Sequence, residues 1–87
     1  MSLTDIERLG GWLGKTKTPD FLHDDQVIAE ILDRMPCACL VHLIDPLNIW
    51  RCWPDNRIQN EYYNSIDRRM AVMKAAIGIV KDEKLAA

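Results

Sequence analysis

The sequence lacks the long apolar runs of a membrane protein and the short motifs of most enzymes. It has no run of 18 apolar residues and no basic leader before an apolar segment, so we expect a soluble, non-secreted protein. Its glycines at Gly10, Gly11 and Gly14 follow no strand pattern and precede no Lys-Ser pair, which argues against a phosphate-binding loop. We therefore predict no catalytic residues and no enzyme activity.

Cysteine and histidine are also scarce, with three cysteines and two histidines in the chain. Cys37 and Cys39 are too close in an extended chain to bridge comfortably, so no disulfide framework is expected and a reducing cytoplasm fits best. Cys37, Cys39, His42 and Cys52 include the atom types that bind zinc, but they lack the two ligand pairs of common zinc sites. We interpret the cysteines as structural and predict no metal and no cofactor. A metal- or thiol-dependent site at these residues is the least favoured of the three functions considered for this chain.

A strong positive charge is absent as well, because the formal net charge is −2 at neutral pH. Binding to nucleic acid without sequence preference needs a broad positive field, so this class of partner is disfavoured. The second alternative is a small DNA-binding transcriptional regulator. In that reading the phosphates are contacted by four arginines, which are Arg51, Arg57, Arg68 and Arg69.

What the chain does have is enough apolar sequence to fold. It has 87 residues, of which 48% are hydrophobic and 28% charged, and this length and composition fit a single domain spanning residues 1–87. Apolar residues repeat with helical spacing over 3–13 and again over 27–35, and each repeat predicts an amphipathic helix. Thr18 and Asp24 are both plausible N-caps for the second helix, with a break favoured between them, and Pro36 ends the helix.

The middle of the chain does not separate strand from helix by its pattern. Residues 37–44 are apolar apart from His42, and no convincing partner strand is evident, so we predict a short buried helix there. Asp45-Pro46 has the form of a helix start, which predicts a short helical turn over 47–53.

The C-terminal third predicts one long helix over about 55–84. Ile58, Tyr62, Ile66 and Met70 follow one another at steps of four, and later apolar residues continue the same face. The expected fold is therefore all-α, a small bundle of three or four helices with a long C-terminal helix.

The second half of this long helix is apolar on nearly every side, so it needs packing partners on two sides. We therefore predict a homodimer that forms through this helix. The predicted self-association residues are Met70, Ala71, Met73, Ala75, Ile77 and Gly78.

Aromatic residues are few, at 7% of the chain, but four of them cluster around arginine between positions 50 and 63. Aromatic and arginine side chains are enriched where proteins bind one another. We predict that Trp53 is exposed and that Trp50 faces inward with Leu47. The leading interpretation is a non-enzymatic protein-protein interaction module of unknown partner. Its predicted interface residues are Trp50, Arg51, Trp53, Tyr62 and Tyr63.

Overall fold

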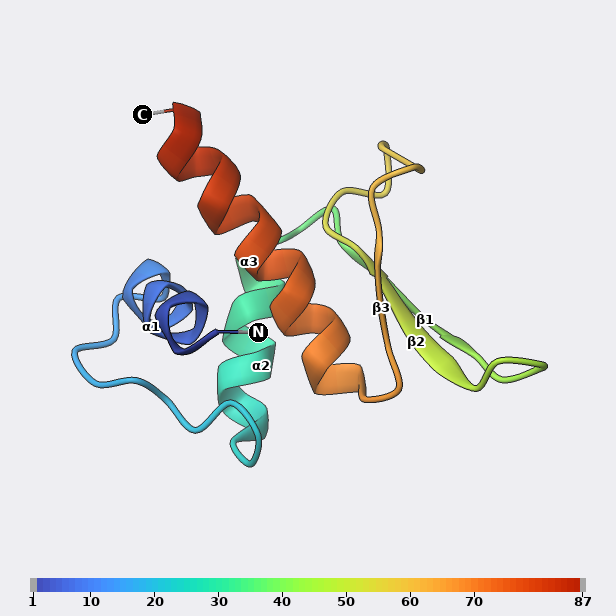
Figure 1. The fold of residues 1–87 in the computed structure, drawn as a ribbon, viewed down its shortest axis with the longest axis horizontal. Coiled ribbons are helices and arrows are strands. Elements are labelled where there is room, and N and C mark those ends of the chain that lie inside the picture. The colour runs from blue at the N-terminus through green and yellow to red at the C-terminus, as the bar shows by residue number, and fades with distance from the viewer. Residues whose placement is uncertain (1, 87) are drawn as a thin grey trace.

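The chain folds as three helices and a three-stranded antiparallel sheet (Figure 1). This computed structural model describes the backbone of residues 2–86 and the side chains of residues 2–82. The predicted all-α helical bundle is therefore wrong, and the chain is an α+β protein. In chain order the elements are α1 (Leu3–Trp12), α2 (Asp25–Asp33), β1 (Cys39–Leu43), β2 (Ile49–Trp53), β3 (Tyr63–Ser65) and α3 (Arg68–Ala86).

The two N-terminal helices confirm their predicted positions. The Ser2 hydroxyl caps α1 by accepting a hydrogen bond from the Asp5 amide at 3.2 Å. The Asp24 carboxylate caps α2 by accepting from the Gln26 amide at 3.0 Å. Each cap satisfies an amide that has no partner inside its helix, which explains why the helices start there.

Residues 39–53 form a β-hairpin, so the two short helices predicted in this region are wrong. Leu40 pairs with Cys52 and Val41 pairs with Arg51 in an antiparallel ladder. The Asp45-Pro46 dipeptide lies in the connecting loop instead of starting a helix, and its peptide bond is cis. In the same loop Asn48 adopts a left-handed backbone with φ of 46°, a conformation that asparagine tolerates better than most residues.

The predicted long C-terminal helix is also wrong in its first half, because α3 begins only at Arg68. The preceding segment is a loop followed by the short strand β3, which adds to the edge of β2. Ile58 and Ile66, which supported the helical pattern, are 42% and 84% exposed. The steps of four from Ile58 through Tyr62 to Ile66 therefore reflect no buried helix face.

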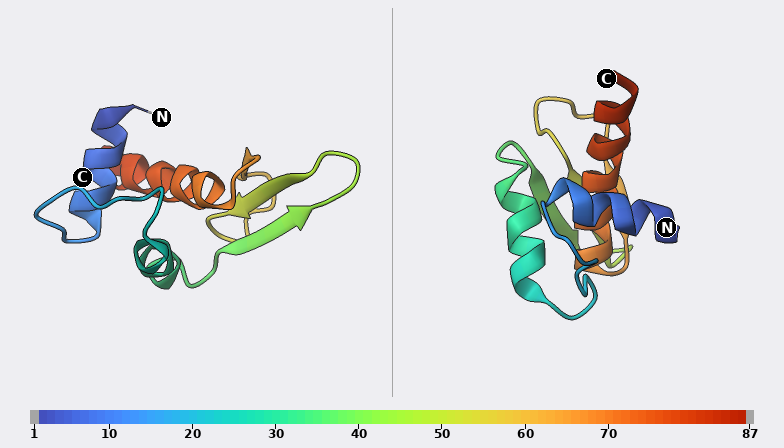
Figure 2. Two further views of the ribbon diagram at one scale, coloured as in Figure 1. Left: turned by 90° about the horizontal axis from the view of Figure 1, so that it is seen from below. Right: turned by 90° about the vertical axis from the view of Figure 1, so that its left-hand side faces the viewer.

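Helix α3 lies between two layers, with α1 and α2 on one side and the sheet on the other (Figures 1 and 2). On the helical side, Val72, Met73 and Ile77 pack with apolar residues of α1 and α2. On the sheet side, Ala71 and Ala75 pack against Cys52. This arrangement explains why α3 is apolar on two sides. In the part of the chain that the structure describes, no helix has the length and apolar character needed to cross a membrane.

Candidate functional site

The two faces of the sheet have different surroundings. Successive side chains of a strand point to opposite faces, so the register assigns each residue to one of them. The inner face packs on α3 and carries Leu40, Trp50, Cys52 and Tyr63. His42 also lies on this face, stacked on Trp50 with ring centroids 4.2 Å apart.

The opposite side of the sheet, here called the outer face, has no helix packed on it in the described chain (Figure 1). One row across the strands contains Val41, Arg51 and Asn64, and the next contains Leu43 and Ile49. All of these side chains except the exposed Asn64 are half-buried. The outer face consists of Cys39, Val41, Leu43, Ile49, Arg51, Trp53 and Asn64.

Arg51 lies at the centre of the outer face on an aromatic platform. Its guanidinium carbon is 4.2 Å from the Tyr62 ring centroid and 5.7 Å from that of Trp53. Its Nε donates a hydrogen bond to Asn64 Oδ1 at 2.8 Å. The Trp53 indole is itself held by donating to the Gln59 carbonyl at 3.0 Å. Each group in this cluster therefore fixes the position of another.

No carboxylate of the described residues forms an ion pair with Arg51, which distinguishes it from two of the other arginines. Arg57 makes a two-point contact with Asp55, at 2.9 Å from Nε to Oδ1 and 2.8 Å from Nη2 to Oδ2. These hydrogen bonds lower the pKa of Asp55 to about 2. Arg69 is paired with Asp25. Two of the four arginines that were predicted to contact phosphates are thus already paired with a carboxylate, which weighs against the DNA-binding alternative.

The structure divides the predicted interface residues between the two faces. Arg51 and Trp53 lie on the outer face, and Tyr62 packs beside Trp53 with ring centroids 5.9 Å apart. Trp50 and Tyr63 instead lie on the inner face. The inward position of Trp50 is as predicted, but Leu47, its expected neighbour, is 60% exposed in the hairpin loop.

The structure divides the predicted self-association residues between the two sides of α3, within the fold of one chain. Ala71, Met73, Ala75 and Ile77 are buried, while Met70 and Gly78 are half-buried. The sheet and the N-terminal helices thus supply the packing partners whose absence motivated the predicted dimer. Self-association stays a prediction, with no surface assigned to it.

The three cysteines and His42 do not converge on one point. Cys39 lies on the outer face, whereas His42 and Cys52 lie on the inner face. Among the described residues, no three His, Cys, Asp or Glu side chains are grouped as metal ligands would be. Cys52 is buried, and this burial, together with the nearby Cys39, raises its pKa to about 11. The Cys52 thiol is therefore protonated, and a poor nucleophile, at neutral pH.

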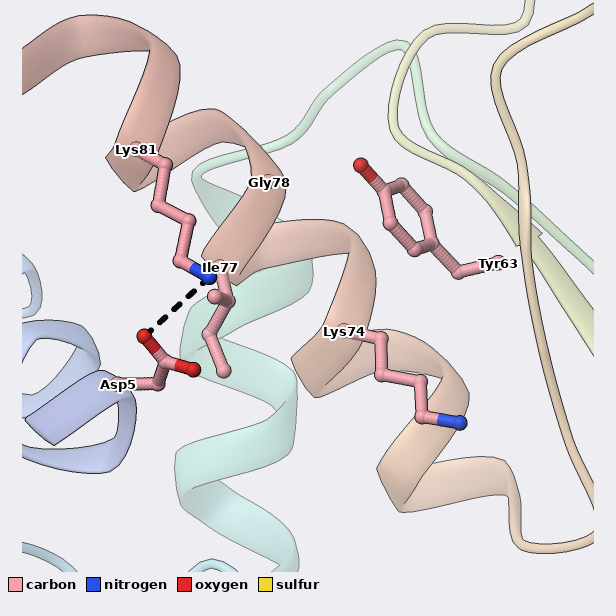
Figure 3. A pocket seen from close by; sticks show the side chains of 6 residues that line it. All are labelled: Asp5, Tyr63, Lys74, Ile77, Gly78 and Lys81. Carbon is pink, nitrogen blue, oxygen red and sulfur yellow. Dashed lines mark ion pairs between the residues drawn. The ribbon is translucent and has the colours of Figure 1, made fainter. Parts of the chain in front are cut away.

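A pocket of about 230 Å³ lies between α1, β3 and α3 (Figure 3). Its charged groups contact other protein atoms, because Lys81 pairs with Asp5 at 3.4 Å and Lys74 donates to the Asn64 carbonyl at 3.0 Å. Burial, with the nearby Asp82 and Glu61 charges, raises the pKa of Tyr63 above its ordinary value. Ligand pockets usually exceed about 300 Å³. The pocket is smaller than this, and its two lysines and Asp5 are engaged in contacts within the fold.

Sequence reasoning missed the aliphatic half of the outer face. The sequence pattern places Val41 and Leu43 in a short buried helix and Ile49 in a short helical turn, because these apolar runs lack the alternation of apolar and polar residues that indicates a strand. Comparisons with known protein families, with curated proteins and with solved structures give no match. Any functional assignment therefore depends on the geometry of this face.

Proposed function

We propose that this protein is a non-enzymatic interaction module that binds a protein partner through the outer face of its sheet. The observation that supports the proposal is the composition of that face. It presents apolar, aromatic and arginine side chains that no helix of the described chain covers. Side chains of these kinds contribute most of the binding energy in protein interfaces.

The fixed geometry of the Arg51, Trp53 and Tyr62 cluster adds to this support. Binding loses affinity when flexible side chains must be ordered, at about 0.5–1.5 kcal/mol each. Here the contacts with Asn64 and Gln59 hold Arg51 and Trp53 before any partner arrives. A partner would therefore meet a surface that needs little rearrangement.

Partner capture by matched tryptophan variants tests the proposal. Trp12 is a suitable control, because it is also half-buried and also has an arginine over its ring, with Arg34 at 5.5 Å. Trp12 lies on α1, away from the sheet. We expect wild-type protein and Trp12→Ala to retain the same partners from a lysate of the source organism, and Trp53→Ala to lose them by about thirtyfold in affinity.

Circular dichroism must show that each variant is folded. If Trp53→Ala does not fold, Val41→Gln provides a second variant, because it makes the outer face polar without touching the contacts of Trp53. If the folded outer-face variants retain the same partners as the wild-type protein, binding uses another surface.

A further inference from the structure

We infer that the partner presents a carboxylate to Arg51, flanked by apolar side chains that cover Val41, Leu43 and Ile49. This inference rests on the proposed function and names the chemistry of the partner for the same face. An acidic, amphipathic protein segment has this character. The argument depends on the state of Arg51 and on the identity of its neighbours.

Arg51 is a cation with unused hydrogen-bonding capacity. Its Nε bonds to an amide oxygen of Asn64, a neutral acceptor, so the positive charge is not balanced there. No hydrogen bond from either terminal nitrogen to a described residue is present, and no described carboxylate pairs with the group. A guanidinium can hold a carboxylate through two parallel N–H···O bonds. The Arg51 group is free to do so.

The aromatic platform fixes the direction from which the carboxylate can approach. The Tyr62 ring lies 4.2 Å from the guanidinium carbon, so the ring occupies one side of the group. Asn64 takes the Nε edge, which leaves the terminal nitrogens for an external group. The guanidinium therefore keeps its orientation when the partner is absent, and little side-chain entropy is lost on binding.

The rest of the outer face favours protein over nucleic acid as the source of the negative charge. Arg51 is the only basic residue on this face, and the adjacent row contains Leu43 and Ile49. A phosphate backbone is bound by several cations along its length, whereas one cation beside aliphatic side chains suits an apolar segment with a single acidic residue. The net charge of −2 agrees with this preference.

Selection from a random peptide library tests the inference and does not require the natural partner to be identified. Peptides displayed on phage are selected on the wild-type protein, and the binding of each enriched peptide is then measured by fluorescence polarisation. We expect the enriched peptides to combine Asp or Glu with apolar residues. Replacing that acid by its amide, or using Arg51→Gln protein, should weaken binding roughly tenfold or more.

Two variants at Val41 provide a matched control. Val41 is the direct cross-strand neighbour of Arg51, so Val41→Glu places a carboxylate of the chain itself beside the guanidinium. Val41→Gln introduces a side chain of almost the same size as Glu but without the charge. We expect Val41→Glu to weaken the acidic peptides roughly tenfold more than Val41→Gln does.

The possible outcomes separate this inference from the proposed function. The inference would be overturned if the peptides require Trp53 but contain no acidic residue, or if they bind Arg51→Gln as well as the wild-type protein. Either result would leave the outer face as the interface. Enriched peptides that depend on neither Trp53 nor Arg51, or no enrichment, would overturn both. Binding of single-stranded or duplex oligonucleotides that requires Arg51, in place of peptides, would also overturn the inference.

Discussion

Tyr63 lies so close to Gly78 that a larger residue at position 78 would collide with its ring. A Cβ atom built on Gly78 would come within 2.9 Å of Tyr63 Cζ and closer still to the hydroxyl. Replacing a helix glycine by alanine ordinarily gains about 1 kcal/mol, but overpacking of this kind costs about 1–3 kcal/mol. We therefore expect Gly78→Ala to lower the free energy of unfolding, measured by urea denaturation.

The same substitution should become stabilising once the ring is removed. In a Tyr63→Ala background, the alanine at position 78 meets no ring, so only the gain in helix propensity should remain. The double-mutant cycle therefore isolates the contact between positions 63 and 78. Gly11→Ala is the control, because a Cβ there would have no neighbour within 4 Å. If Gly78→Ala destabilises both backgrounds equally, the contact with Tyr63 is not the cause.

Cys52 should make the stability of the protein sensitive to alkaline pH. Its pKa in the folded state is about 11, above its ordinary value of 9.0, so the folded state holds the proton more tightly than the unfolded state. The contribution of the protonated Cys52 thiol to the free energy of unfolding is fully present below pH 9 and is lost as the pH rises from about 9 to 11. Wild-type protein should therefore lose up to about 2–3 kcal/mol more than Cys52→Ala over this range.

Urea denaturation of both proteins at several pH values measures the difference. The comparison with Cys52→Ala is needed because every other titratable group of the chain is present in both proteins and cancels in the difference. Parallel pH profiles would mean that Cys52 ionises normally in the folded state.

Among the elements, α2 offers a direct test of the cap that its sequence predicts. Asp24→Ala removes the acceptor for the Gln26 amide and should lower the free energy of unfolding by about 1 kcal/mol. Asp33→Ala is the matched control, because Asp33 is exposed and ends the same helix. A carboxylate at that end opposes the helix dipole, so its removal should be neutral or slightly stabilising. Equal losses in the two variants, measured by thermal denaturation, would contradict the capping role.

The elements also show how far the sequence predicts this fold. Helices α1 and α2 were predictable because cap, periodicity and stop signal agree within each segment, as at Asp24 and Pro36. The hairpin was not, because residues 39–43 become a strand only by pairing with residues 49–53. That pairing is a non-local interaction, and the local pattern of an apolar run does not reveal it.

The candidate site was predictable to a similar degree. Trp53, Arg51 and Tyr62 were found from residue type, and the structure places them together. Residue type did not separate them from Trp50 and Tyr63, because the face on which a side chain lies depends on strand register. Val41, Leu43 and Ile49 were missed for the same reason.

At the scale of the whole molecule, the same strand register determines which residues of the sheet cover α3 and which lie on the outer face. The inner residues of the sheet cover Ala71 and Ala75, which closes the core without a second chain. The outer residues of the same strands are then left with no helix packed on them in the described chain. A single sheet therefore completes the core with one face and leaves the other as the proposed binding surface.

This division predicts that a charge on the side of α3 that packs against the sheet, where Ala71 and Ala75 lie, will unfold the chain. Ala75 is fully buried in an apolar cluster with Ala71 and Cys52, so Ala75→Glu would place a carboxylate among apolar side chains. An unpaired buried charge costs several kcal/mol, comparable to the whole stability of a small domain. Ala29→Glu is the matched control, because Ala29 is exposed on α2 and should tolerate the same change.

Circular dichroism and sedimentation of both variants, at several protein concentrations, measure the effect. We expect Ala75→Glu to lose helical signal at every concentration, because the damage lies within one chain, and Ala29→Glu to resemble the wild type. If Ala75 were instead at a dimer interface, Ala75→Glu would be a folded monomer of about half the wild-type mass. That result would show that α3 is covered by a second copy of the chain, and that the sheet does not close the core by itself.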